Sequence, residues 1–144
     1  MRHWKLLTMA AALVVQAPAW AANLQATIYR NPNCGCCNVY AQYLRTQGFD
    51  VKLVDTLDLA ATQQKYGVPE RLEGCHTALI GGYVFEGLVP AEDIKRVIAD
   101  HRPIKGLSVP GMPFGAPGMP GPKAAPINVY YLDASSPPRV FATF

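Results

Sequence analysis

The sequence contains little of what several large classes of protein depend on. Only four of its 144 residues are cysteine, far too few for a small scaffold held together by disulfide bonds. Charged residues make up 16% of the chain and hydrophobic residues 50%, which excludes a disordered acidic or basic tail. No run of lysine or arginine concentrates the formal net charge of +3, so nothing indicates a nucleic-acid partner. The chain is long enough for one domain that buries its own core.

The first 21 residues have the pattern of an export signal. They read MRHWKLLTMAAALVVQAPAWA, with a basic start and then an apolar stretch from Leu6 to Val15. Small residues around Trp20 predict cleavage after Ala21. Because the apolar stretch is about half the length that a membrane-spanning helix needs, we predict no membrane span after cleavage, and an uncleaved anchor is the less favoured alternative. We therefore expect residues 22–144 to function outside the cytoplasm.

Strand and helix patterns alternate along the mature chain. We predict strands at 25–30 and 51–54, helices at 36–47 and 58–66, a hairpin of 77–80 and 83–85, and a helix at 90–101. The order strand, helix, strand, helix, strand, strand, helix is that of a thioredoxin-like α/β fold with three layers. Such folds place their reactive cysteines in the first turn of the first helix.

The composition changes abruptly between residues 103 and 126. Seven prolines and five glycines fall within these 24 residues, so we expect neither a helix nor a central strand there. The tetrapeptide Pro-Gly-Met-Pro occurs twice in this loop and supplies Met112 and Met119, the only methionines after the signal peptide. Residues 127–144 alternate as two strands around a turn, and we expect an appended C-terminal hairpin that packs on or extends the sheet. Residues 22–144 would thus form one domain.

The four cysteines fall in two places. Cys34, Cys36 and Cys37 open the first predicted helix, where thiols have lowered pKa values because the helix dipole favours thiolate. Cys75 and His76 precede the third strand, in a loop that faces the first helix in thioredoxin-like folds and usually carries a cis-proline in redox members. A dithiol enzyme needs two sulfurs, so the others require another explanation. The pattern predicts that four sulfurs converge.

Four converging thiolates favour a soft metal ion. Such ligands select Cu(I), Zn(II) or an iron–sulfur cluster. Outside the cytoplasm, unpaired thiols oxidise, so these cysteines should be either disulfide-bonded or occupied by metal. Zinc ribbons use two CxxC knuckles, a spacing that this chain lacks. Copper is therefore the preferred interpretation, with disulfide chemistry and zinc or another metal as open alternatives.

Three further residues are candidates for additional ligands or for neighbours of the ligands. The thioethers of Met112 and Met119 are soft donors for Cu(I), although methionines also fill gaps in apolar contacts. In an extended loop their sulfurs would lie roughly 20 Å apart, so both reach one site only if the loop folds back. His76 adjoins Cys75, but adjacent strand residues point to opposite faces.

Several short motifs together resemble those of the CopG-type periplasmic copper-resistance proteins. They are YRNPNCGCC at 29–37, GVP at 67–69, CHTA at 75–78, GGYV at 81–84, EG at 86–87, VPA at 89–91, DI at 93–94, GL at 106–107 and VPGMP at 109–113. The resemblance covers nearly all of the mature chain. It implies a thioredoxin-like fold and a Cu(I) site, holding several ions, on the four cysteines. The family often has histidine where this chain has Leu88, so a second imidazole is missing.

The prediction is therefore a periplasmic copper-binding protein that sequesters, transfers or redox-handles copper in copper tolerance. Cys34, Cys36, Cys37 and Cys75 would hold Cu(I). The expected partners are copper ions and other periplasmic copper-handling proteins, and no catalytic residue is assigned. One alternative is a periplasmic thiol–disulfide oxidoreductase that uses Cys34 and Cys37. Another is a structural metal or disulfide domain whose Pro/Gly-rich loop is a docking surface.

Overall fold

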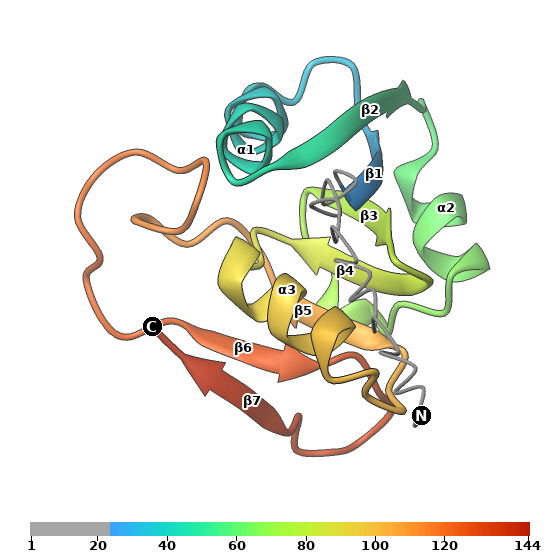
Figure 1. Cartoon of the computed structure of the whole chain (residues 1–144), viewed down its shortest axis with the longest axis vertical. Coiled ribbons are helices and arrows are strands. Elements are labelled where there is room, and N and C mark those ends of the chain that lie inside the picture. The colour runs from blue at the N-terminus through green and yellow to red at the C-terminus, as the bar shows by residue number, and fades with distance from the viewer. Residues whose placement is uncertain (1–23) are drawn as a thin grey trace, which may run out of the picture.

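A computed structural model describes residues 24–144, so the predicted signal peptide lies outside the described residues (Figure 1). The elements, in chain order, are β1 (Leu24–Arg30), α1 (Gly35–Thr46), β2 (Phe49–Asp55), α2 (Leu59–Lys65), a 3-10 turn (Glu70–Leu72), β3 (His76–Ile80), β4 (Tyr83–Gly87), α3 (Ala91–Ala99), β5 (Gly106–Val109), β6 (Asn128–Tyr131) and β7 (Val140–Thr143). Among residues 24–144, no helix combines the length and the apolar character needed to cross a membrane.

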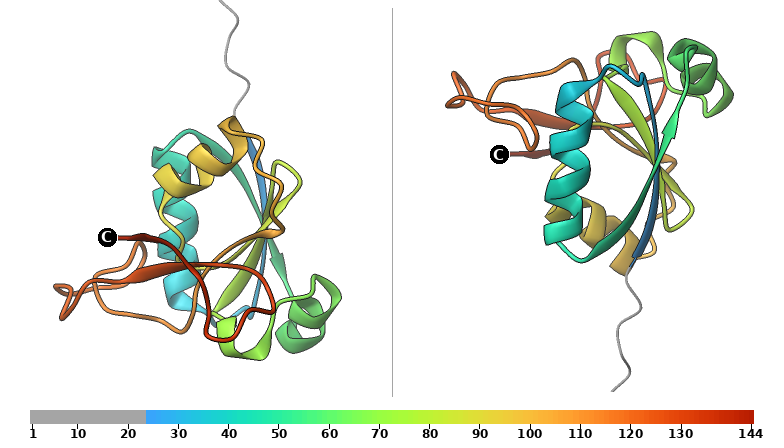
Figure 2. Two further views of the ribbon diagram at one scale, coloured as in Figure 1. Left: turned by 90° about the horizontal axis from the view of Figure 1, so that it is seen from below. Right: turned by 90° about the horizontal axis from the view of Figure 1, so that it is seen from above.

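The strands form one mixed sheet in the order β2-β1-β3-β4-β5-β6-β7. β1 and β2 run parallel, β3 runs antiparallel to both β1 and β4, and β5 is parallel to β4. α1 and α3 cover one face of the sheet, and α2 lies on the other (Figure 2). The predicted thioredoxin-like α/β fold is confirmed.

Helix α1 begins and ends where its sequence directs. Cys34 is the N-cap, and its sulfur accepts a hydrogen bond from the Cys37 amide. Tyr40, Ala41 and Leu44 are buried on the face toward the sheet. Gly48 follows with a φ of 88°, a left-handed conformation that glycine adopts without strain. The first turn of α1 is thus fixed beside the end of β1.

The expectation that residues 103–126 hold no central strand is wrong. Residues 106–109 form β5, which lies between β4 and β6 with all four residues buried. The high proline content of the whole segment does not apply to residues 104–109, which contain no proline. This stretch can therefore form backbone hydrogen bonds with a strand on each side. The pairing of β5 with β4 requires a glycine at position 106, because a Cβ there would overlap the carbonyl oxygen of Val84 on β4.

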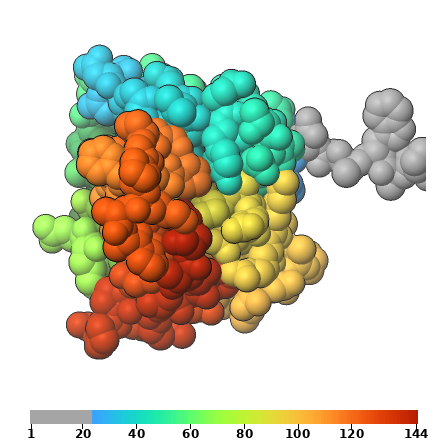
Figure 3. All heavy atoms as spheres, turned by 90° about the vertical axis from the view of Figure 1, so that its left-hand side faces the viewer, coloured from blue at the N-terminus to red at the C-terminus, as the bar shows by residue number. Residues whose placement is uncertain are grey.

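The predicted C-terminal hairpin is confirmed and extends the sheet. β6 pairs antiparallel with β5, and β7 pairs antiparallel with β6. The hairpin lies on the side of the sheet that carries α1 and α3 (Figure 2), and the Arg96 guanidinium of α3 lies 4.5 Å from the centre of the Phe141 ring. Residues 110–122, which we call the methionine loop, lie between α1 and this hairpin on the surface shown in Figure 3.

Candidate metal centre

One end of the sheet collects every segment that carries a candidate ligand. β1 ends at Arg30, opposite His76, the first residue of the antiparallel strand β3. β4 ends at Gly87, opposite Val109 at the end of β5. The cysteine-bearing turn of α1, the Cys75 segment and the methionine loop therefore leave or enter the sheet at the same end. The strand directions place these distant segments at the same end of the sheet.

The sulfurs of all four cysteines lie within 4.8 Å of one another. Cys34 and Cys37 are joined in a disulfide bond, whereas Cys36 and Cys75 are free thiols. The Cys34 and Cys36 sulfurs are 3.3 Å apart, and Cys37 Sγ lies 3.3 Å from the carbonyl oxygen of Cys75. Cys37 is buried, and the other three are half-buried. The predicted convergence is confirmed, while the role of the four as metal ligands stays a prediction.

The Cys75 thiol is held in its neutral form by its surroundings. Burial raises its pKa well above the ordinary value, and the neighbouring Cys36 raises it further. A negative charge on Cys75 therefore needs a compensating positive charge close by, which a bound cation would provide. The cluster favours a cationic occupant.

His76 lies beside the cluster and is completely buried. Its Nδ1 atom is 3.3 Å from the Cys75 sulfur, and its ring centre is 4.6 Å from that of Tyr40. Burial lowers the pKa of His76 to about 3, against a smaller opposing effect of the Gly87 backbone, so the imidazole is neutral. The structure thus places His76 in contact with Cys75, and its role as an additional ligand or as a neighbour of the ligands stays a prediction.

The methionine loop folds back on the cluster. Met112 Sδ lies 3.8 Å from Cys36 Sγ, and Met119 lines a cavity of about 400 Å³ together with Cys36 and Val39. A backbone hydrogen bond from the Met119 amide to the Ala116 carbonyl closes the turn that brings Met119 round. Gly118 packs against the Cys36 carbonyl, where a Cβ would come within 3.0 Å. Both methionines therefore flank the exposed side of Cys36.

Sequence analysis missed a cation beside the cysteines. The Arg30 side chain is largely buried at the end of β1, with Nη1 3.5 Å from the Cys34 carbonyl and Nη2 3.0 Å from Asp55 Oδ1. A guanidinium there places a fixed positive charge beside a turn that would carry thiolates. No signal in the sequence marked it, because its place depends on the antiparallel pairing of β1 with β3, in which Arg30 stands opposite His76.

Glu86 is a second residue that sequence reasoning did not single out. Its carboxylate is completely buried and accepts hydrogen bonds from three donors, Gln63 Nε2, the Gly74 amide and Thr77 Oγ1. Burial raises the pKa of Glu86 to about 7, although these hydrogen bonds act in the opposite direction. No periodicity marks this residue in the sequence, because a glutamate in a strand usually faces solvent.

The raised pKa of Glu86 predicts a measurable pH dependence of stability. Folding binds a proton between the ordinary pKa of 4.5 and the folded value of about 7, so this contribution is present below pH 4.5 and is lost as the pH rises to 7. Relative to Glu86→Gln, the wild type should therefore lose at most about 3 kcal/mol between pH 4.5 and 8. Urea unfolding of both proteins across this range measures the difference.

The comparison with Glu86→Gln is needed because His76 changes the stability with pH in the opposite direction. Its folded pKa lies below its ordinary value, so its contribution is lost as the pH falls. That contribution is common to both proteins and cancels in the difference. A difference that stays constant from pH 4.5 to 8 would contradict the assignment to Glu86.

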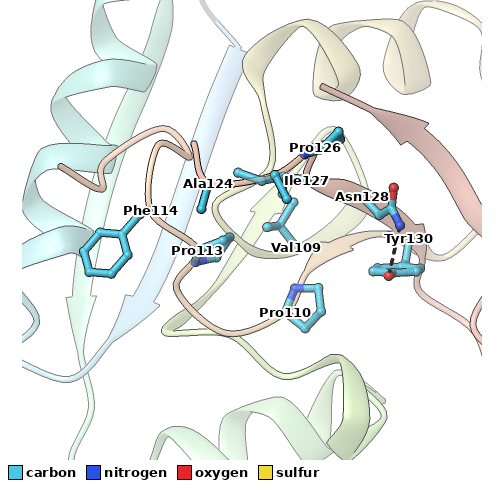
Figure 4. Close-up of a pocket in the computed structure, with 10 residues that line it drawn as sticks. Val109, Pro110, Pro113, Phe114, Ala124, Pro126, Ile127, Asn128 and Tyr130 are labelled. Atoms are coloured by element: carbon cyan, nitrogen blue, oxygen red, sulfur yellow. Dashed lines mark hydrogen bonds between the residues drawn. The ribbon is translucent and has the colours of Figure 1, made fainter. Parts of the chain in front are cut away.

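A separate cavity of about 370 Å³ lies between the methionine loop and the segment that leads into β6 (Figure 4). Its lining is largely apolar and contains no cysteine or histidine, and comprises Val109, Pro110, Pro113, Phe114, Ala124, Ala125, Pro126, Ile127, Asn128 and Tyr130. A hydrogen bond from Asn128 Nδ2 to the Tyr130 hydroxyl closes one side. This cavity lacks the soft donors that the sulfur cluster offers.

Comparison with solved structures gives two matches to copper resistance protein CopG. Its form 2 is 36% identical, with a TM-score of 0.76, and the match covers 84% of this chain and 98% of that one. Form 1 has the same identity and TM-score and covers 85% and 98%. This chain belongs to the CopG family. A family model described as a protein of unknown function, DUF411, matches residues 72–119, and no curated protein matches. The predicted family is therefore confirmed.

Proposed function

We propose that this CopG-family protein binds Cu(I) on the thiolates of Cys34, Cys36, Cys37 and Cys75 and protects against copper. The observation that carries the proposal is the convergence of four sulfurs, from α1 and from the segment before β3, to within 4.8 Å. The two similar structures are of copper resistance proteins, which supports copper as the ion. The four sulfurs can hold more than one copper ion, because one thiolate can bridge two ions.

The donor set suits Cu(I) better than zinc. Zinc accepts thiolates, imidazoles and carboxylates, but a thioether is a ligand characteristic of soft copper. Met112 lies 3.8 Å from Cys36, and Met119 approaches the same cysteine. We therefore propose both methionines, together with His76, as additional ligands or as contacts of the ligands. A copper ion would neutralise the thiolates, which the N-terminus of α1 and Arg30 also favour.

Cys36 is the position at which copper enters and leaves in this proposal. Cys37 is buried, whereas Cys36 is half-buried and faces both methionines. Thioethers bind Cu(I) more weakly than thiolates and can pass the ion between the cluster and a donor outside. We propose that sequestration or hand-over of copper, in the periplasm after removal of residues 1–21, is the biological role, with other copper-handling proteins as partners.

The redox state of the protein should control its copper capacity. The Cys34–Cys37 disulfide withdraws two of the four sulfurs. We expect two reactive thiols in the unfolded oxidised protein and four after reduction, with tight Cu(I) uptake only by the reduced form. An anaerobic Cu(I) titration against a chromophoric chelator, with a thiol count on each sample, measures this. Equal uptake by both forms, or no uptake by the reduced form, would sink the proposal.

A second candidate function is thiol–disulfide exchange, which the Cys34–Cys37 disulfide itself favours. A substrate dithiol would be oxidised to a disulfide while Cys34–Cys37 is reduced to two thiols, so electrons and protons balance. This activity needs neither Cys75 nor the methionines. Oxidation of a dithiol substrate by the oxidised protein that persists in Cys75→Ser, in a protein without tight Cu(I) uptake, would favour this candidate over the first.

A further inference from the structure

We propose that Glu86 is a positioning residue that holds Cys75 against the first turn of α1 and thereby sets the affinity for Cu(I). The inference rests on the proposed function for its copper readout, but the placement of Cys75 can be measured without copper. Glu86 is not a ligand in this proposal, since its carboxylate is fully occupied by other donors. It acts through the Gly74 amide on one side of Cys75 and the Thr77 hydroxyl on the other.

The hydrogen bonds of Glu86 bracket Cys75. One carboxylate oxygen accepts from the Gly74 amide at 2.8 Å, directly before the cysteine. The other accepts from Thr77 Oγ1 at 2.7 Å, two residues after it. Gln63 on α2 donates to the first oxygen at 2.6 Å and also to the Gly74 carbonyl at 3.2 Å. The short segment that presents Cys75 is thus anchored at both ends to one buried group.

Backbone packing leaves this segment little room to compensate for a lost anchor. A Cβ on Gly74 would lie 2.7 Å from Gly87 Cα, so the backbone segments at these two glycines pack directly against each other. On its other side, Gly74 forms a β-bridge with Gly111, and the Gly111 amide donates to the Glu73 carbonyl at 3.0 Å. The residue after Gly111 is Met112. The segment that Glu86 anchors is therefore connected both to Cys75 and to the start of the methionine loop at Met112.

Metal sites depend strongly on such supporting groups. Loss of a residue that orients a ligand typically weakens metal binding by about 10–100-fold although every ligand remains. In Glu86→Ala the Gly74 amide, the Thr77 hydroxyl and the Gln63 amide all lose their common partner. The Cys75 segment would then shift toward water, which can satisfy these donors, and the sulfur would leave its place.

The test compares Glu86→Ala with the isosteric Glu86→Gln. Cu(I) competition titrations should show affinity about 10–100-fold weaker for Glu86→Ala. Near wild-type affinity should return in Glu86→Gln, whose amide oxygen can accept from Gln63 and Gly74 while its NH2 group donates to the Thr77 hydroxyl. Without copper, peptide mapping of the reduced protein should show faster iodoacetamide alkylation at Cys75 in Glu86→Ala. Ile94→Ala, which truncates a buried side chain of α3, is the control for general destabilisation.

The outcomes separate the two proposals. Wild-type affinity and wild-type Cys75 alkylation in folded Glu86→Ala would overturn the positioning role, as would equal losses in Ile94→Ala. If the wild type takes up no Cu(I), the proposed function fails, and alkylation of Cys75 alone decides the role of Glu86. If Glu86→Ala does not fold, Thr77→Val decides, because it removes one anchor: weaker binding and faster Cys75 alkylation support the role, and no change overturns it.

Discussion

Cys75→Ser is expected to weaken Cu(I) binding by about 100-fold, one of the largest functional losses expected from a single substitution in the cluster. Cys75 is the one sulfur of the cluster that does not come from the first turn of α1, so its loss opens one side of the site. A serine hydroxyl is a hard ligand and cannot replace a thiolate toward Cu(I). Structural zinc sites with four ligands have a metal-binding free energy of about 10–16 kcal/mol. If the four sulfurs contribute equally to a binding free energy of this size, each one contributes about 3 kcal/mol, which corresponds to about 100-fold in affinity.

Anaerobic competition titration of the reduced proteins measures this loss. Cys36→Ser should behave similarly, and it should also uncouple Met112, which lies 3.8 Å from the Cys36 sulfur. Asn38→Ser is the matched control, because it places a serine on the exposed side of the same helix without removing a sulfur. Undiminished uptake by both cysteine variants would show that copper binds elsewhere.

Gly106→Ala is expected to cost about 3 kcal/mol or more of folding free energy, the largest structural effect that one methyl group has here. The added Cβ would overlap the Val84 carbonyl oxygen, which is part of the rigid pairing between β4 and β5. Backbone cannot move aside as a flexible side chain does, so the two strands must separate. The loss should appear as a lower urea midpoint or as an unfolded chain.

Gly35→Ala is the matched control for this prediction. Gly35 is the first residue of α1, and nothing lies within 4 Å of the position that its Cβ would take. Alanine restricts the unfolded chain and suits a helix, so this change should be neutral or stabilising by about 0.4–1 kcal/mol. Equal stability of the two alanine variants would refute the steric explanation for Gly106.

The parts of the structure that the sequence predicts are those governed by local rules. α1 is readable from the spacing of Tyr40 and Leu44 and from Gly48, and the β3–β4 hairpin from Gly81-Gly82. The N-cap role of Asp58, whose carboxylate accepts from the Ala61 amide at 2.8 Å, is equally local. These signals fix the order of the strands and helices. The facing positions of Cys34 and Cys75 follow from that order.

The parts that escaped prediction depend on contacts between distant residues. β5 is hidden by surrounding prolines, and its pairing with β4 and β6 joins residues far apart in the sequence. The approach of Met112 to Cys36 requires the bridge between Gly74 and Gly111, which no local pattern encodes. The burial of Glu86 likewise depends on Gln63, a residue of α2 that faces inward. Nothing within a window of ten residues reveals any of these contacts.

The long sequence separations within the cluster tie metal capture to the end of folding. Cys34 and Cys75 are 41 residues apart, and Cys36 and Met112 are 76 residues apart. A chain that has formed only its first strands and α1 presents three cysteines but neither the fourth sulfur nor the thioether. Non-local contacts form late because their loop entropy must be overcome first. High-affinity copper binding would therefore indicate that the strands of the sheet have paired as far as β5.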